Sequence, residues 1–189
     1  RLLTLFTTWG VCACMMERGH VLNGRDALIG EIGHMQISGC PEKLCGCGKR
    51  HCLESAVRLD HLHQLLMTEK ASWLEQEPLT FQSLFTHSRQ GDPAARKIVE
   101  YLARCYASAL HNLSLCYNQE AVVFQGDMAW ADPYFDQCLK RELDEFRYYP
   151  EGEWLTTRYD RRELSTLAAR GDAALLRKKY FAAMSYEDD

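Results

Sequence analysis

The residues best suited to chemistry lie together in residues 30–54, which read GEIGHMQISGCPEKLCGCGKRHCLE. The stretch holds four cysteines and two histidines, and Cys45, Cys47 and Cys52 fall within eight residues. Thiolates and imidazoles are the ligands that zinc binds in a tetrahedron of four. Glycines between the cysteines allow the backbone to turn tightly enough for the thiolates to reach one ion. The spacing therefore predicts a zinc site, with free reduced thiols as the alternative.

Three thiolates leave one position of a tetrahedral site open. The candidates for the fourth ligand are His34, Cys40 and His51. His51 directly precedes Cys52, so both side chains would reach the same ion only with difficulty. A redox-active dithiol is a weaker interpretation, because Cys45 and Cys47 are separated by one residue rather than two.

The remaining cysteines favour a reduced protein. Nine cysteines is an odd number, so complete pairing in disulfides would leave one over. Five of them lie in apolar sequence surroundings, where a free cysteine behaves as a small buried hydrophobe: Cys12, Cys14, Cys105, Cys116 and Cys138. We therefore expect a cytoplasmic protein, in which clustered cysteines are metal ligands more often than disulfides.

The composition is that of a globular domain. The 189 residues are 47% hydrophobic and 25% charged, with a net charge of -4 and no basic tract that would bind nucleic acid. No apolar run approaches the roughly 20 residues of a membrane span, and no signal peptide is visible. The chain begins at Arg1 inside an apolar run, so we expect it to be part of a longer protein.

Strands and helices alternate along the chain, which favours a layered α/β fold. Residues 2–22 predict two strands followed by a turn and a further extended piece. Further strands are expected at 121–127 and 153–159, and helices at 53–67, 79–90, 91–118, 133–146 and 163–184, the last in two pieces broken at Gly171.

The helix at 91–118 carries the clearest pattern. Asp92 can cap it, and Pro93 suits its first turn. Its apolar face repeats at helical spacing through Ile98, Leu102, Cys105, Ala109, Leu113 and Cys116.

With these residues named, the stretch from Gly30 to Glu54 resembles the signature of the ROK family, G-E-x-G-H-M followed by C-x-C-G-x-x-G-C-L-E. This family holds bacterial sugar kinases and sugar-responsive transcriptional repressors, and weaker similarity covers nearly the whole chain. The resemblance implies that residues 1–189 form one C-terminal lobe of an actin-like ATPase (ribonuclease H-like) fold. That lobe would be a mixed sheet flanked by helices, with a zinc-bound loop.

The resemblance also implies roles for individual residues. Glu31, His34 and Glu54 would contact sugar hydroxyls, so His34 would use one ring nitrogen for zinc and the other for sugar. Without the resemblance, the two acids would be read as solvated loop and helix-start residues. A structural zinc would be bound by His34, Cys45, Cys47 and Cys52.

Two departures from the family pattern lie in this loop. His51 stands where the family has glycine, and the segment after His34 is one residue longer and contains Cys40. Cys40 is therefore a possible substitute for His34 as the fourth zinc ligand.

The family's ATP-binding motifs are eroded. The glycine-rich stretch of the first hairpin reads TTWGVCACMM, in which Gly10 remains and the side chains of Trp9, Cys12 and Cys14 replace glycines. A later G-G pair reads Gly126-Asp127, and ARGDAALL near the C-terminus departs from the small-residue pattern. The family's catalytic aspartate would precede Arg1, so no catalytic residue is identified.

The resemblance therefore favours a non-enzymatic role, as the sugar-sensing domain of a ROK-type regulator close to the NagC and xylose-repressor type. The expected partners are a small sugar or sugar phosphate, and DNA bound through an upstream winged helix-turn-helix. The family also implies a homodimer or homotetramer, for which the long helix from Asp92 to Asn118 is a candidate interface. No membrane is expected. The alternatives are a kinase for a hexose or N-acetylhexosamine, and a zinc-stabilised scaffold that binds a protein partner without a ligand.

Overall fold

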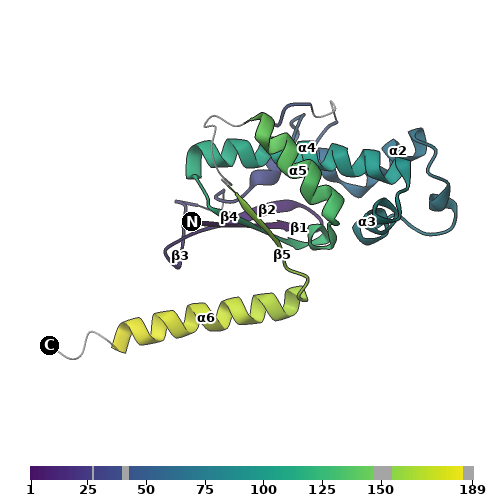
Figure 1. Cartoon of the computed structure of the whole chain (residues 1–189). Coiled ribbons are helices and arrows are strands. Elements are labelled where there is room, and N and C mark those ends of the chain that lie inside the picture. Colours follow the sequence, from purple (N-terminus) through teal and green to yellow (C-terminus); the bar gives the residue numbers. More distant parts are fainter. Residues whose placement is uncertain (27, 40–42, 147–154, 185–189) are drawn as a thin grey trace.

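A computed structural model describes residues 1–26, 28–39, 43–146 and 155–184 (Figure 1). Its centre is a five-stranded sheet of order β3-β2-β1-β4-β5. The strands are β1 (Leu2–Thr7), β2 (Val11–Glu17), β3 (His20–Val21), β4 (Ala121–Gly126) and β5 (Thr156–Tyr159). β2 pairs antiparallel with both β1 and β3, whereas β4 pairs in parallel with β1, and β5 in parallel with β4. The expected mixed sheet is confirmed.

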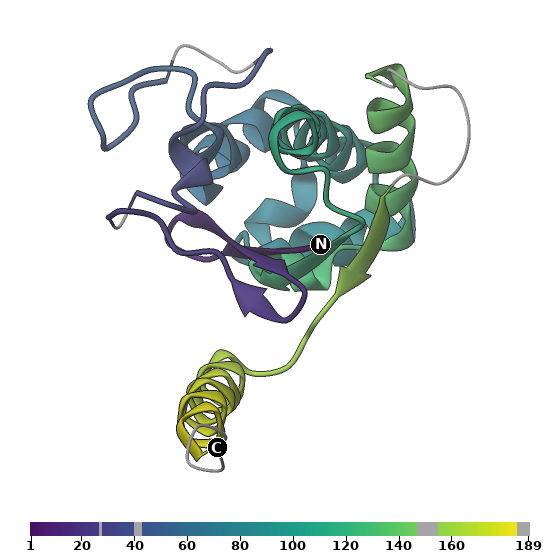
Figure 2. The same cartoon turned by 90° about the vertical axis from the view of Figure 1, so that its left-hand side faces the viewer.

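Helices cover one face of this sheet, and one helix lies on the other side (Figures 1 and 2). The 25-residue helix α4 (Pro93–Tyr117) packs beside α5 (Pro133–Glu145) above the sheet, and α6 (Leu164–Met184) leaves the end of β5 toward the opposite side. The helices are α1 (Leu53–Val57), α2 (Leu59–Thr68), α3 (Phe81–Gln90), α4 (Pro93–Tyr117), α5 (Pro133–Glu145) and α6 (Leu164–Met184). Short 3-10 turns are η1 (Ile32–His34), η2 (Ser72–Glu75) and η3 (Asp127–Trp130).

The core lies between the sheet and the α4 layer. Tyr106 of α4, Phe124 of β4 and Phe135 of α5 pack edge to face against one another, with ring centroids 5.8–6.2 Å apart. The Tyr106 hydroxyl also forms a 3.0 Å hydrogen bond with Oγ1 of Thr7, the last residue of β1. This contact fixes the strand end from which the β1–β2 turn, Thr8–Gly10, departs.

The predictions for the start of α4 are confirmed. Asp92 caps it by accepting a 2.7 Å hydrogen bond from the Ala95 amide, and Pro93 occupies its first turn. Asn118 ends the helix in the left-handed region, with φ 50°.

Three cysteines predicted to be buried are exposed. Cys12 and Cys14 alternate along β2 with the buried Val11, so they lie on the face of the sheet that points away from α4. Cys116 is exposed although Tyr117 in the same last turn is buried, so the buried face of α4 ends on Leu113 and Tyr117 rather than on Cys116. Cys105 and Cys138 are buried as expected.

Two helix predictions need correction. The expected helix at 53–67 is divided into α1 and α2 at Arg58, whose backbone is extended with φ -65° and ψ 141°. The expected break at Gly171 is absent, because a glycine inside a helix costs only about 1 kcal/mol and α6 continues through it. Within the described part of the chain, no helix is both long and apolar enough to cross a membrane.

Candidate metal and sugar site

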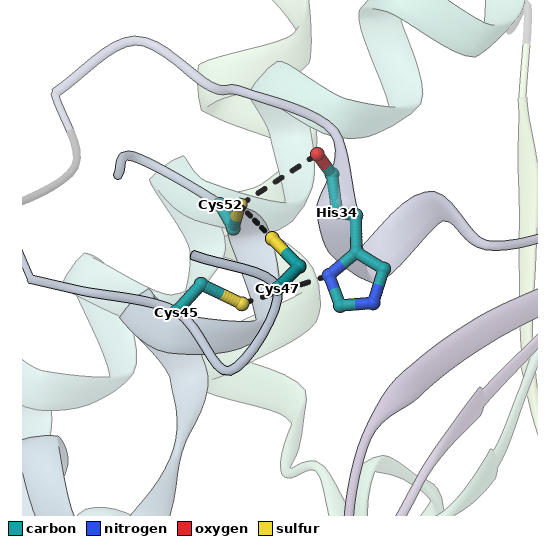
Figure 3. Close-up of side chains that lie close together, drawn as sticks. All are labelled: His34, Cys45, Cys47 and Cys52. Atoms are coloured by element: carbon teal, nitrogen blue, oxygen red, sulfur yellow. Dashed lines mark hydrogen bonds between the residues drawn. The ribbon is translucent and has the colours of Figure 1, made fainter. Parts of the chain in front are cut away.

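The structure gathers His34, Cys45, Cys47 and Cys52 into one cluster (Figure 3). Their ligand atoms all lie within 4.8 Å of one another. His34 Nδ1 is 3.6 Å from Cys45 Sγ, and Cys47 Sγ is 3.7 Å from Cys52 Sγ. A tetrahedral ion with bonds of roughly 2.0 Å to nitrogen and 2.3 Å to sulfur would separate neighbouring ligands by about 3.5–3.8 Å. The cluster can therefore hold a metal ion.

A tight turn positions the three thiols. The Cys45 amide donates to the Lys49 carbonyl over 2.8 Å, and Gly48, with φ +80°, closes the turn back to the Cys45 carbonyl. Cys52 follows as the N-terminal flanking residue of α1 and is bridged to Gln36 of the preceding loop. This bridge brings the end of η1, where His34 lies, beside the thiols.

The geometry of the cluster distinguishes between the two histidines predicted as the fourth metal ligand. Among the described residues, the histidine within reach of the three thiols is His34, not His51. His51 takes a left-handed backbone, with φ 65°. Cys40, the other candidate, lies outside the described residues.

The thiols differ in acidity. Burial raises the pKa of the Cys52 thiol to about 12, and the neighbouring sulfurs of Cys47 and Cys45 add to the increase. A hydrogen bond from the backbone of Lys49 lowers the pKa of Cys47. A cation bound between these sulfurs would favour the thiolate at both positions.

The predicted sugar-binding residues surround this cluster. His34 Nδ1 faces the Cys45 sulfur, while His34 Nε2 lies 3.9 Å from Glu31 Oε2. Glu54, in the first turn of α1, has Oε1 4.0 Å from the Cys45 sulfur and accepts the Val11 amide at Oε2 over 3.4 Å. The His34 and Glu31 side chains are 38% and 50% exposed. Two carboxylates and one imidazole are thus available at the surface of the cluster.

A cavity of about 300 Å³ opens beside Glu54. Its walls are the β1–β2 turn with Trp9, the start of α3 at Phe81, and the α1–α2 junction at Arg58 and Asp60. Glu31 and His34 are not among its lining residues. Sequence reasoning missed Arg58, Asp60 and Phe81, because their placement depends on the break between α1 and α2.

A second cavity of about 350 Å³ lies on the other side of the β1–β2 turn. It is bounded by the ends of β4 and β5 and the start of α6. The Arg161 guanidinium lies 5.3 Å from the centre of the Trp130 ring, and its Nε donates to the Ala129 carbonyl. Burial raises the pKa of the Asp127 carboxyl. Charged and aromatic side chains therefore line this cavity.

Two glycines kept from the eroded motifs have packing roles. A Cβ at Gly10 would lie 2.7 Å from Glu54 Oε2. A Cβ at Gly126, where φ is +69°, would lie 2.1 Å from the Thr7 carbonyl oxygen. Close approach of other groups of the chain therefore accounts for both glycines.

The comparison with known protein families agrees with the resemblance of the cysteine loop. The sequence profile of the ROK family matches residues 2–179. The chain belongs to the ROK family. The cysteine-bearing loop that contains Cys45, Cys47 and Cys52, the mixed sheet and helices α1 to α5 lie within the matched residues, and α6 extends beyond them to Met184.

Both a transcriptional regulator and a sugar kinase are similar to this chain in sequence. The DNA-binding transcriptional dual regulator NagC of Escherichia coli K12 is 27% identical over 147 residues, which are 73% of this chain and 36% of NagC. An N-acetylmannosamine kinase of Yersinia pestis is 29% identical over 130 residues, which are 69% of this chain and 42% of the kinase. The chain therefore spans about two fifths of the length of the relatives it matches.

Solved structures of the family share the fold. A ROK hexokinase from Thermus thermophilus has a TM-score of 0.63 and 26% identity, over 82% of this chain and 51% of the hexokinase. A ROK transcriptional regulator, described as a homologue of the Escherichia coli MLC protein, has a TM-score of 0.68 and 23% identity, over 86% of this chain and 42% of the regulator. The expected actin-like sugar kinase fold is thus shown, and its neighbours include both regulators and kinases.

Proposed function

We propose that this chain is the sugar-sensing part of a ROK-family transcriptional regulator. One observation carries the proposal: the carboxylate and imidazole groups suited to sugar hydroxyls are present, while Asp127 stands in the second cavity. A carboxylate there would repel the phosphates of a nucleotide. ATP-dependent chemistry is therefore disfavoured, whereas recognition of a sugar is not.

A structural zinc would be bound by His34, Cys45, Cys47 and Cys52. The donor set of three thiolates and one imidazole is one that zinc prefers in structural sites. Binding through Nδ1 would fix the tautomer of His34 and leave a proton on Nε2, which lies toward Glu31. One equivalent of zinc per chain is expected from elemental analysis, and a folded, metal-free protein would refute the site.

The sugar would be held by Glu31, His34 and Glu54. Carboxylates accept hydrogen bonds from vicinal hydroxyls, and the Nε2 proton of His34 would be donated to a third oxygen. The named relatives include a regulator called an N-acetylglucosamine repressor and an N-acetylmannosamine kinase. The ligand proposed is accordingly a hexose or N-acetylhexosamine, free or phosphorylated.

Sugar binding would act on DNA through a shift between conformations. The longer protein proposed here has this C-terminal lobe, a second sugar lobe and an upstream winged helix-turn-helix, and it acts in the cytoplasm as a homodimer or homotetramer. A sugar that binds one arrangement of lobes and subunits more tightly than another changes the affinity for DNA, by at most the difference between its two binding free energies.

The test uses the full-length protein. Calorimetry with a panel of hexoses and N-acetylhexosamines should show binding by the wild type and none by Glu54→Ala or Glu31→Ala. DNA binding without sugar should be unchanged in both variants. Glu145→Ala, an exposed carboxylate at the end of α5, is the matched control and should behave as wild type. If Glu54→Ala and Glu31→Ala both still bind sugar as the wild type does, the proposal is wrong.

A sugar kinase is the second candidate, favoured by the named kinases among the relatives. ADP formation by the full-length protein with any sugar of the panel would support it. The third candidate is a zinc-stabilised scaffold, and intact zinc without heat from any sugar would favour it.

A further inference from the structure

Trp9 is a large, mostly apolar side chain that is almost fully exposed to solvent in this lobe. It stands at the tip of the β1–β2 turn, where the Thr8 amide donates to the Gly10 carbonyl over 3.0 Å. Its side chain is 98% exposed, although it lines the cavity beside Glu54. An indole carries more apolar surface than most side chains, so leaving it in water forgoes a substantial hydrophobic gain.

The turn that carries Trp9 is fixed at both of its ends. On one side, Thr7 is tied to the buried Tyr106 hydroxyl. On the other side, the Val11 amide donates to Glu54 Oε2 over 3.4 Å. The Glu54 carboxylate lies so close beneath Gly10 that a Cβ there would come within 2.7 Å of it. The backbone that carries the indole is therefore held in place beside the carboxylate, and both residues line one cavity.

The cavity beside Trp9 and Glu54 is lined by both apolar and polar side chains. Val57, Leu59 and Phe81 supply apolar surface, and Glu54 supplies hydrogen-bond acceptors. Arg58 and Asp60 complete the lining as an ion pair, with Arg58 Nε 3.2 Å from Asp60 Oδ1. The Glu54 carboxylate accepts the Val11 amide at Oε2 over a long 3.4 Å, and since a carboxylate has about four lone-pair sites, it keeps acceptor capacity for a ligand in the cavity.

A pyranose ring has the matching pair of surfaces. Its C–H bonds form an apolar face that can lie flat on an aromatic ring, and its hydroxyls project from the rim toward hydrogen-bond acceptors. We propose that Trp9 is the platform on which the sugar ring lies while Glu54 accepts its hydroxyls. This inference rests on the proposed function and adds which feature of the sugar is recognised: a closed ring with a C–H face.

The test measures affinity in the full-length protein. The probes are N-acetyl-D-glucosamine, N-acetyl-D-mannosamine and D-glucose, with the open-chain polyol D-sorbitol as the non-ring control. Trp9→Ala should weaken binding of the pyranose that binds wild type best by about tenfold, and Trp9→Phe by less. D-Sorbitol should bind both proteins equally weakly.

A matched control comes from the second cavity. Trp130, also partly exposed, stacks with Arg161 on the far side of the same turn. Trp130→Phe should leave sugar affinity unchanged. Saturating sugar should shift tryptophan emission to shorter wavelength in wild type and Trp130→Phe, and the shift should vanish in Trp9→Phe.

The outcomes separate this inference from the proposed function. If no pyranose binds the wild type, both fail. If Glu54→Ala abolishes binding while Trp9→Ala keeps wild-type affinity and the emission shift, only the platform role is wrong. The platform role is also wrong if Trp9 emission in the sugar-free protein already resists quenching by acrylamide, because another part of the protein then covers the indole. Trp9→Phe keeps an aromatic ring at the turn, so it guards against a loss of folding in Trp9→Ala.

Discussion

The two cavities that flank the β1–β2 turn differ in what fills them. On the Glu54 side, a carboxylate acceptor and an exposed indole line the cavity, and the metal-ligand cluster lies next to Glu54 without lining it. On the Asp127 side, a carboxylate with a raised pKa and an arginine–tryptophan stack line the space instead. Each side keeps one glycine of a nucleotide motif, Gly10 or Gly126. In both cases another group of the protein, the Glu54 carboxylate or the Thr7 carbonyl, approaches too closely for a larger side chain. A retained glycine is thus weak evidence for a retained phosphate site.

Removing a ligand of the metal cluster, which lies on the Glu54 side, should reduce stability more than any other change. Cys52→Ser removes a thiol that is fully buried at the start of α1. We expect zinc to be lost and the free energy of unfolding to fall by at least about 4 kcal/mol, because the loop loses its crosslink. Elemental analysis and chemical denaturation would measure both.

Cys116→Ser is the matched control, since that cysteine is exposed and distant from the cluster in the sequence. It should keep one zinc and wild-type stability. A Cys52→Ser protein with a full equivalent of zinc would show that the cluster is not the metal site.

Gly126→Ala should have the next largest effect, on the Asp127 side. The new Cβ would lie 2.1 Å from the Thr7 carbonyl oxygen in a left-handed backbone, and backbone atoms give way poorly. We expect a loss of about 2–3 kcal/mol in unfolding free energy. Zinc content and sugar affinity of the folded protein should stay unchanged. Wild-type stability in thermal unfolding would contradict the packing role.

Gly10→Ala should act on ligand binding rather than on stability. Its Cβ would meet the end of the Glu54 side chain, which can rotate away, and its backbone is not left-handed. We expect sugar affinity to fall by about tenfold as the carboxylate is displaced, with a loss of stability below about 1 kcal/mol. Calorimetry and denaturation on the same preparation test this, and unchanged affinity would place the sugar away from Glu54.

Asp127→Asn should have the smallest effect, and it depends on pH. Because burial raises the pKa of Asp127, the folded protein binds this proton more readily than the unfolded chain does. Ionisation therefore costs stability as pH rises above the ordinary aspartate range. The variant should be more stable than wild type at pH 7, by less than about 1 kcal/mol given partial solvation, and equal to it at about pH 3, below the ordinary aspartate pKa.

Thermal unfolding of both proteins at the two pH values would measure the difference. Loss of metal at low pH affects both proteins alike, so the difference between them is the informative quantity. A wild type more stable than the variant at pH 7 would mean that Asp127 has a favourable partner.

Local patterns predicted the elements well where the chain decides its own conformation. The cap at Asp92, the β2–β3 turn at Arg18–Gly19 and the strand at 121–127 need only neighbouring residues, and the structure has all three. The same patterns predicted a break at Gly171 that the structure does not have, because glycine disfavours a helix only weakly. They also missed the division at Arg58, since apolar spacing continues through it.

The sequence by itself determined the family, the mixed α/β fold and the set of side chains able to bind a metal, because close spacing forces Cys45, Cys47 and Cys52 together. Only the tertiary structure decided that His34 rather than His51 completes the cluster, and that Cys12 and Cys14 face outward. It alone placed Trp9 and Glu54, 45 residues apart in the chain, at one cavity. These outcomes depend on which face of a strand or loop meets which helix, and that geometry is set by packing between distant segments rather than by spacing along the chain.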